Sequence, residues 1–357
     1  METNILKYQD WSPEIIELIN NMGKTMQSKI HHAEGDVLTH TQMVFNEVIS
    51  NYGMFDDKTK RILEYVAIFH DIAKPMTTVF EDGDWRSPGH AKLGEKVSRE
   101  VLTNLDNNAK DIIGSLIRHH GLPIWFSEKR NPEMELIKCS LRCNIEHLSY
   151  FAECDFRGRI CGDLEESLYK IELFRESAQN LNCFNKPFEF TSDWARLHYF
   201  KKGGYPLKEI WEPQGGTFVL MVGLPGSGKN TWVDKNWNGN VIELDTIRKQ
   251  MKIKPTDKSG QGIVANRAKE MMKEFLRRGE SVLWNATNVT EQQRSSLIDI
   301  ALQYDSKIEI VFMNTDLNDV INQNRNRESK VPEDVIINLS RKMEIPRLHE
   351  CHKLKVI

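Results

Sequence analysis

The residues with the most evident chemistry follow the apolar run Thr217 to Val222, where three glycines and a lysine fall within nine positions. Glycines at this spacing let successive backbone N–H groups point into one concavity, and the helix expected after them adds its positive end. The lysine then reaches the outer phosphates of a nucleotide. The pattern predicts a binding loop for ATP, or another nucleoside triphosphate, together with Mg²⁺. Its residues are Gly223, Leu224, Pro225, Gly226, Ser227, Gly228, Lys229, Asn230 and Thr231.

This loop departs from the usual pattern at the position after the lysine, where a serine or threonine normally binds magnesium. Asn230 stands there, and Thr231 comes one place later. The carbonyl oxygen of an asparagine is itself an acceptable ligand for a hard cation. The sequence therefore leaves the magnesium ligand open.

Charged residues suited to phosphoryl transfer follow the loop. An apolar stretch, Val241 to Leu244, delivers Asp245 at its end, with Arg248 one helical turn further on. We expect Asp245 to take the proton from an attacking hydroxyl and Arg248 to orient the acceptor, although a helix N-cap also explains Asp245. Arg325 and Arg327 are predicted to lie on a lid that stabilises charge in the transition state, and a solvated basic helix is the alternative.

A second set of chemistry-bearing residues lies in the first half of the chain. His70 and Asp71 follow an apolar run and, at the end of a buried helix, could both reach one divalent cation. Any one histidine alone is more often a packed or surface residue, but here the order along the chain is His, His-Asp, His, His, Asp. Lys74 and Arg118 could neutralise a bound phosphate. The candidate ligands are His40, His70, Asp71, His90, His119, His120 and Asp155.

The hydrophobic pattern divides the chain into two parts. From Met1 to about Asn182 apolar residues recur every three or four positions, as in helices. After residue 216, four expected strands (217–222, 240–244, 281–285 and 307–314) alternate with helical stretches, which predicts a parallel sheet with its ligand at the carboxyl ends of the strands. We therefore predict a multi-domain protein of α and α/β class. An all-helical domain spans 1–205, a linker 206–216, and an α/β domain with a parallel sheet flanked by helices 217–357.

Composition limits the function classes. A length of 357 residues suggests about two domains. No segment approaches ~20 uninterrupted apolar residues, and the first ten residues lack a basic start and an apolar run, so we expect a cytoplasmic protein that does not engage a membrane. The six cysteines include no C-x-x-C pair, which favours reduced, packed thiols over a zinc site or a disulfide framework.

The ordered histidines and aspartates resemble the HD phosphohydrolase superfamily, an all-helical fold that binds one or two divalent metals. The resemblance covers about residues 32–159. The sequence around His40 is most similar to that of HD domains attached to bacterial tRNA nucleotidyltransferases. It implies hydrolysis of phosphate esters with a transition metal such as Mn²⁺, Ni²⁺ or Co²⁺. It assigns the metal to His40, His70, Asp71 and Asp155, and a second metal to His90 with either His119 or His120.

The second half resembles the P-loop polynucleotide 5′-kinase family. The similar elements are Gly-x-Pro-Gly-Ser-Gly-Lys, Leu-Asp-x-x-Arg and the basic lid, over about residues 217–357. An HD unit followed by such a kinase is similar to the bacterial and phage HD-Pnk family of end-healing enzymes. That resemblance implies 5′-phosphorylation of RNA or DNA ends and removal of a 3′-phosphate or 2′,3′-cyclic phosphate, with a ligase acting downstream.

Two other functions fit the same residues. One is an HD nucleotidase fused to a small-molecule nucleoside kinase. The other is an HD hydrolase gated by ATP that the P-loop half binds without transferring phosphate, which Asn230 favours. The sequence alone does not choose RNA over DNA, or one metal over two.

Overall fold

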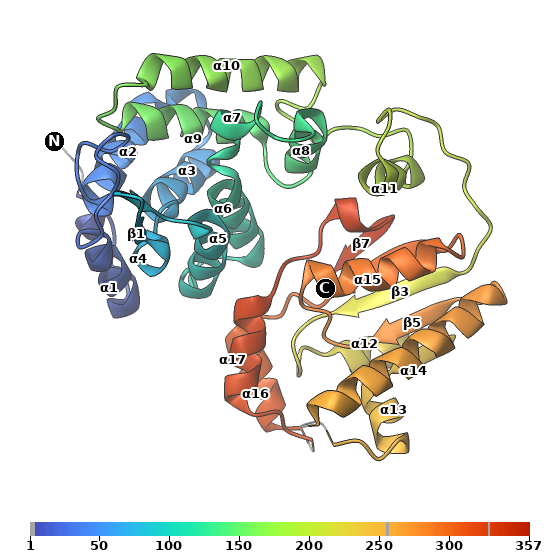
Figure 1. The fold of residues 1–357 in the computed structure, drawn as a ribbon. Helices are drawn as coiled ribbons and strands as arrows, with labels where there is room; N and C mark the ends of the chain where they lie inside the picture. Colours follow the sequence, from blue (N-terminus) through green and yellow to red (C-terminus); the bar gives the residue numbers. More distant parts are fainter. Residues whose placement is uncertain (1–3, 255–256, 328) are drawn as a thin grey trace. The chain divides into compact units, whose positions relative to one another are not determined.

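The computed structural model of the protein describes residues 4–254, 257–327 and 329–357. The chain forms two compact units, Met1–Glu189 and Phe190–Ile357 (Figure 1). Among the described residues, no helix combines the length and the apolar character that crossing a bilayer requires.

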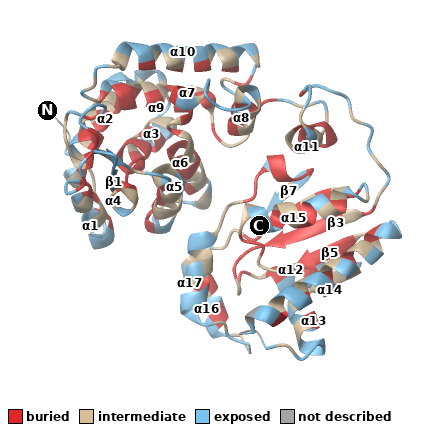
Figure 2. Ribbon diagram, viewed as in Figure 1, coloured by how far each residue is buried: buried red, intermediate tan, exposed pale blue. Residues whose placement is uncertain are grey.

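The first unit is built from helices around a core in which α2, α3, α6 and α9 pack on one another. Figure 2 colours the buried residues of these helices red. Side-chain caps define where these four helices begin, because Asp36, Asp56, Asp106 and Asn144 each accept a backbone N–H of the first turn. The elements are η1 (Ile5–Lys7), α1 (Pro13–Met22), α2 (Val37–Asn51), η2 (Tyr52–Met54), α3 (Asp57–Phe69), α4 (Lys74–Thr77), α5 (His90–Val101), α6 (Asn107–His119), α7 (Leu122–Trp125), α8 (Pro132–Ser140), α9 (Ile145–Arg157) and α10 (Leu164–Asn180).

This unit is not entirely helical. A short antiparallel hairpin of β1 (Val79–Glu81) and β2 (Asp84–Arg86) precedes α5. Its turn is Asp82-Gly83, with both residues at positive φ. An Asp-Gly pair between β-forming residues is a strong hairpin signal, which explains the departure from the all-helical prediction.

The second unit is an α/β domain with a five-stranded parallel sheet in the order β4-β5-β3-β6-β7. Helices α14 and α15 contribute to the apolar cluster on one face, and α12 packs on the other. The strands are β3 (Thr217–Val222), β4 (Asn240–Glu243), β5 (Val282–Asn285), β6 (Lys307–Phe312) and β7 (Lys353–Val356). The helices are α11 (Asp193–Lys202), α12 (Lys229–Asn236), α13 (Leu244–Gln250), α14 (Lys258–Arg277), α15 (Glu291–Leu302), α16 (Leu317–Arg325), α17 (Glu333–Lys342) and η3 (Leu348–Glu350).

Helix α11 belongs to the second unit, whereas the sequence predicted a first domain that continued to residue 205. The Arg196 guanidinium donates to the carbonyl oxygens of Leu348, Cys351 and His352, at 3.0, 3.1 and 2.6 Å. The Trp194 ring also packs against His352, with centroids 3.9 Å apart. A helical pattern shows that α11 is a helix but not which core it joins, so the predicted linker, 206–216, also falls inside the second unit.

Candidate functional site

The first unit gathers His40 of α2, His70 at the end of α3 and Asp155 of α9 into one buried cluster. His40 Nε2 lies 3.0 Å from Asp155 Oδ1 and 3.3 Å from His70 Nε2. One ligand atom from each of the three lies within 4.8 Å of the others. The other ring nitrogens, Nδ1 of His40 and of His70, face the carbonyl oxygens of Gly158 and Ala67 at 3.2 and 2.9 Å. Such contacts orient Nε2 into the cluster.

A second group of three adjoins the first through Asp71. Asp71 Oδ2 lies 3.2 Å from His70 Nε2, while Asp71 Oδ1 lies 3.5 Å from His90 Nε2. His90 Nε2 is in turn 3.4 Å from His120 Nε2. Asp71, His90 and His120 therefore form one potential metal-binding triad, and His40, His70 and Asp155 form the other. We refer to these six residues as the metal cluster.

His120 joins this cluster and His119 does not. The Nδ1 of His120 faces the Ile117 carbonyl at 2.7 Å, and the Nδ1 of His119 faces that of Ser115 at 2.8 Å. His119 groups with Cys139 and Cys143 instead. Burial, and then the neighbouring His90, lower the pKa of His120 to about 3, so this imidazole is neutral at physiological pH, as a metal ligand must be.

Two cations flank the carboxylates of the metal cluster. Lys74 Nζ lies 2.7 Å from Asp71 Oδ2, and Arg159 Nη2 lies 2.6 Å from Asp155 Oδ2. Burial opposes ionisation of both aspartates, but Lys74 and His70 hold the pKa of Asp71 well below its usual value, as Arg159 and His40 do for Asp155. The predicted phosphate-neutralising Arg118 pairs instead with Glu95, at 3.1 Å.

These donors fit divalent transition metals. Imidazole nitrogens and carboxylate oxygens suit Mn²⁺, Ni²⁺ or Co²⁺ better than the softer thiolate donors would. The Nε2 atoms of His40 and His70 lie 3.3 Å apart, and those of His90 and His120 lie 3.4 Å apart. The lone pairs of two such nitrogens repel each other unless a cation or a proton lies between them. Asp71 Oδ1 is buried and makes no hydrogen bond with the described residues, so it has a coordination site to offer.

Three supporting residues were not identified from the sequence. Arg159 follows Asp155 by one helical turn, a spacing at which oppositely charged residues pair, and this signal was available. Glu34 accepts from both His32 and His40, with Oε1 at 2.8 and 3.2 Å. Gln27 Oε1 accepts from Lys74 Nζ at 2.7 Å. No local pattern connects Gln27 or Glu34 to the cluster, because tertiary packing brings them there.

The second unit holds a cavity of ≈ 510 Å³ at the carboxyl ends of the strands, around the glycine loop. Gly223, Gly226 and Gly228 all have positive φ, at 153°, 91° and 89°. A Cβ on Gly223 would lie 2.7 Å from Ser227 Oγ, so this turn requires glycine. The loop leads directly into α12, whose first residue is Lys229. Backbone N–H groups at this helix start suit a phosphate.

The Lys229 side chain is held by backbone carbonyl groups of the glycine loop. Its ammonium donates to the carbonyl oxygens of Gly223 and Leu224, at 2.9 and 2.7 Å. Burial, and then the positive charge of Arg327, lower the pKa of Lys229 to about 8. A bound phosphate would restore the charged form.

The other predicted kinase residues are placed differently from one another. Asp245 and Arg248 form an ion pair and both line the cavity, as does Arg327. Arg325 is not among the described residues that line it, and its guanidinium pairs with Glu333, with Nε 2.8 Å from Oε1. Of the two predicted lid arginines, the structure therefore places Arg327 at the cavity.

Asn230 takes part in a polar chain across the cavity. Asn285 Nδ2, at the end of β5, lies 3.0 Å from Asn230 Oδ1 and 3.1 Å from Glu243 Oε1. The sequence placed a strand end here but gave no role to Glu243. Since an amide and a carboxylate oxygen are hard ligands, Asn230 and Glu243 could serve Mg²⁺ in place of the usual serine or threonine.

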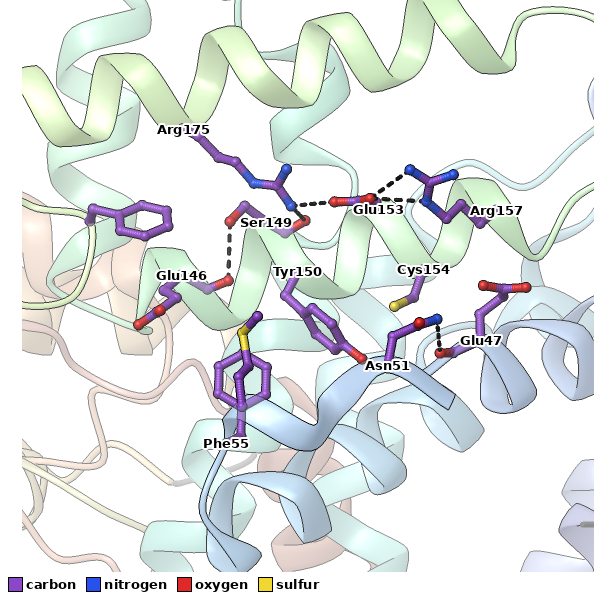
Figure 3. A pocket seen from close by; sticks show the side chains of 12 residues that line it. Glu47, Asn51, Phe55, Glu146, Ser149, Tyr150, Glu153, Cys154, Arg157 and Arg175 are labelled. Carbon is purple, nitrogen blue, oxygen red and sulfur yellow. Dashed lines mark hydrogen bonds and ion pairs between the residues drawn. The ribbon is translucent and has the colours of Figure 1, made fainter. Parts of the chain in front are cut away.

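A larger cavity of ≈ 660 Å³ lies elsewhere in the first unit (Figure 3). None of the described residues that line it belongs to the metal cluster. Three glutamates and two arginines line it, and Glu153 pairs with both Arg175, at 2.6 Å, and Arg157, at 2.8 Å. This cavity therefore does not suit a phosphate group.

Comparison with known proteins bears on the second unit. A family model described as an AAA domain matches residues 218–346. The L-seryl-tRNA(Sec) kinase of Methanococcus maripaludis is 26% identical over 136 residues, which cover 36% of this chain and 52% of that protein. This chain thus spans about half the length of the curated relative. The C-terminal unit is a P-loop domain of the kinase-like type.

Two solved structures match part of this chain at low identity. A gluconokinase from Sinorhizobium meliloti 1021 is 17% identical, with a TM-score of 0.30, over 40% of this chain and 81% of that one. The protein APE1195 is 16% identical, with a TM-score of 0.31, over 41% of this chain and 87% of that one.

Proposed function

We propose that this protein is a bifunctional nucleic-acid end-healing enzyme of the HD-Pnk type. Its second unit would phosphorylate 5′-hydroxyl ends with ATP, and its first unit would remove 3′-phosphates or open 2′,3′-cyclic phosphates. The observation that carries the proposal is the presence in one chain of the metal cluster and of a glycine loop with Asp245 and Arg248 beside it. The products would be the 3′-hydroxyl and 5′-phosphate ends that a ligase joins.

In the first unit, the residues support a two-site arrangement around Asp71. Its two carboxylate oxygens face different triads, so Asp71 could bridge two cations. Divalent metals, when bound, supply an activated water and polarise a phosphoryl oxygen. Lys74 is close enough to Asp71 to move between that carboxylate and a substrate phosphate. Arg159 holds Asp155 and so fixes the orientation of a ligand.

In the second unit, each residue at the cavity has a separate proposed role in phosphoryl transfer. The loop and Lys229 bind the nucleotide phosphates. The Asp245 side chain is 82% exposed and can accept the proton of an incoming hydroxyl. Arg248 lines the same cavity and can hold the acceptor, and Arg327 can stabilise charge on the transferred group.

The test uses γ-labelled ATP with a 5′-hydroxyl oligonucleotide, and in parallel an oligonucleotide with a 3′-phosphate or a 2′,3′-cyclic phosphate. We expect Asp245→Ala to abolish labelling while phosphate release persists, and Asp71→Ala to do the reverse. Asp234→Ala, an exposed change on α12, is the matched control for the kinase unit. Labelling of nucleosides but not oligonucleotides would indicate a small-molecule kinase, and labelling of no acceptor would indicate an ATP-gated hydrolase.

A second acceptor is favoured by the similarity to the L-seryl-tRNA(Sec) kinase. We infer that a hydroxyl carried on an RNA, rather than the 5′ end itself, is the alternative substrate class. The same assay with seryl-tRNA and with the matching uncharged tRNA separates the two. Label that requires the seryl group would replace the 5′-kinase proposal.

A further inference from the structure

The end of α6 carries two adjacent histidines that lie in different surroundings. His120 belongs to the metal cluster, whereas His119 lies beside Cys139 of α8 and Cys143, which follows α8 in the chain. One ring nitrogen of His119 and the two sulfur atoms lie within 4.8 Å of one another. We propose that these three residues, the cysteine–histidine site, bind a thiophilic divalent metal, with zinc as the expected occupant.

The separation of the two sulfur atoms fits a shared metal. Cys139 Sγ and Cys143 Sγ are 3.6 Å apart. Two thiolates bound at about 2.3 Å in a tetrahedral site would lie roughly 3.8 Å apart, whereas a disulfide would bring them to about 2.05 Å. Three residues separate the two cysteines, which is within the usual range for paired zinc ligands. The cysteines thus need little movement to hold a metal.

The orientation of His119 also fits ligation. Its Nδ1 lies 2.8 Å from the Ser115 carbonyl oxygen. Histidines that bind metals commonly donate the second ring N–H to a carbonyl in this way, which fixes the tautomer and aims the other nitrogen.

The donor atoms, rather than burial, separate this site from the metal cluster. Cys139 and Cys143 are only 1% and 7% exposed. Two soft thiolates select zinc over the harder cations that imidazoles and carboxylates accept. The fourth position of a tetrahedral site is left for water. A metal here would tie the end of α6, which carries His120, to the segment between α8 and α9.

Cobalt distinguishes the two kinds of site, because thiolate ligation gives a near-ultraviolet charge-transfer band that histidine and carboxylate ligation does not. The full-length chain, kept reduced, is titrated with Co²⁺. We expect the band, with an intensity that corresponds to one thiolate-bound cobalt per chain, in the natural protein, in Asp71→Ala and in Cys161→Ser, a thiol control outside the site. The band should be absent from the double variant Cys139→Ser, Cys143→Ser. In His119→Ala the apparent affinity for Co²⁺, read from the band, should fall at least tenfold. Addition of Zn²⁺ should remove the band.

A reduced natural protein without the band, or a band that survives in the double variant, would overturn the proposal. Circular dichroism shows whether the double variant folds. If it does not, the natural protein still decides, because Zn²⁺ but not Mg²⁺ should protect Cys139 and Cys143 from alkylation, read by mass spectrometry of the peptides. Equal alkylation with and without Zn²⁺ would also reject the site.

Discussion

The candidate sites of the two units are built by opposite means. The metal cluster is made of side chains drawn from positions 40 to 155, and its carboxylates are almost fully covered, with the Asp71 side chain 2% exposed. The nucleotide loop is nine consecutive residues that act through their backbone, and its partner Asp245 has a side chain 82% exposed. The first site is assembled when the unit folds. The second is built from one continuous segment, and its partner Asp245 stays open to solvent.

The largest expected effect of a substitution concerns the two adjacent histidines at the end of α6, His119 and His120. We expect His120→Ala to lower phosphate release by about 10³-fold, because it removes a ligand worth several kcal/mol of transition-state stabilisation. His119→Ala should lower it far less, since His119 lies outside the metal cluster. Metal-dependent release from a 3′-phosphate oligonucleotide is the measurement. Equal losses in the two variants would contradict the assignment.

The next largest effect is expected at the candidate kinase site, where Arg325 and Arg327 were both predicted to lie on a lid. Arg327→Ala should reduce kinase turnover by roughly 10²-fold, because it removes a cation from the cavity that holds the transferred phosphate. Arg325→Ala should change turnover by no more than about threefold, since an exposed pair such as Arg325–Glu333 contributes little. Steady-state rates with saturating ATP give the comparison. A larger loss for Arg325 would mean that the lid rearranges on closure.

The polar chain across the cavity predicts a smaller effect. Asn285→Ala removes hydrogen bonds to Asn230 and Glu243 and should lower kinase activity about 10- to 30-fold, in line with a charge-assisted hydrogen bond. The loss should be accompanied by a higher Mg²⁺ requirement, which a Mg²⁺ titration measures. If activity fell with an unchanged Mg²⁺ dependence, the chain would serve the fold rather than the cation.

The smallest effect is a pH dependence of nucleotide binding. Lys229 has its pKa lowered to about 8, so the free protein loses this charge as the pH rises through 8. Nucleotide affinity should therefore fall roughly tenfold between pH 7 and pH 9, with proton uptake on binding in the upper part of that range. Calorimetry in buffers of different ionisation enthalpy measures the uptake. Arg327→Ala should reduce it, because one cause of the lowered pKa is then removed.

The sequence predicted the two sites unequally well, for physical reasons. A phosphate loop is local, so nine residues sufficed to locate the cavity that Lys229 lines. The metal cluster depends on tertiary packing, so spacing proposed its ligands but left His119 and His120 open, and only the end of α6 separates them. Strand β7, hairpin β1–β2 and the placement of α11 were missed. Short strands and amphipathic helices do not specify their partners by local pattern.

Lys74 and Arg159 give the first unit a property that small zinc domains lack. Their charges balance two buried carboxylates, so we expect the unit to fold without a metal at the metal cluster. The metal can then bind to the metal cluster after the unit has folded. A chelator should therefore abolish the proposed hydrolytic activity at concentrations that do not unfold the chain.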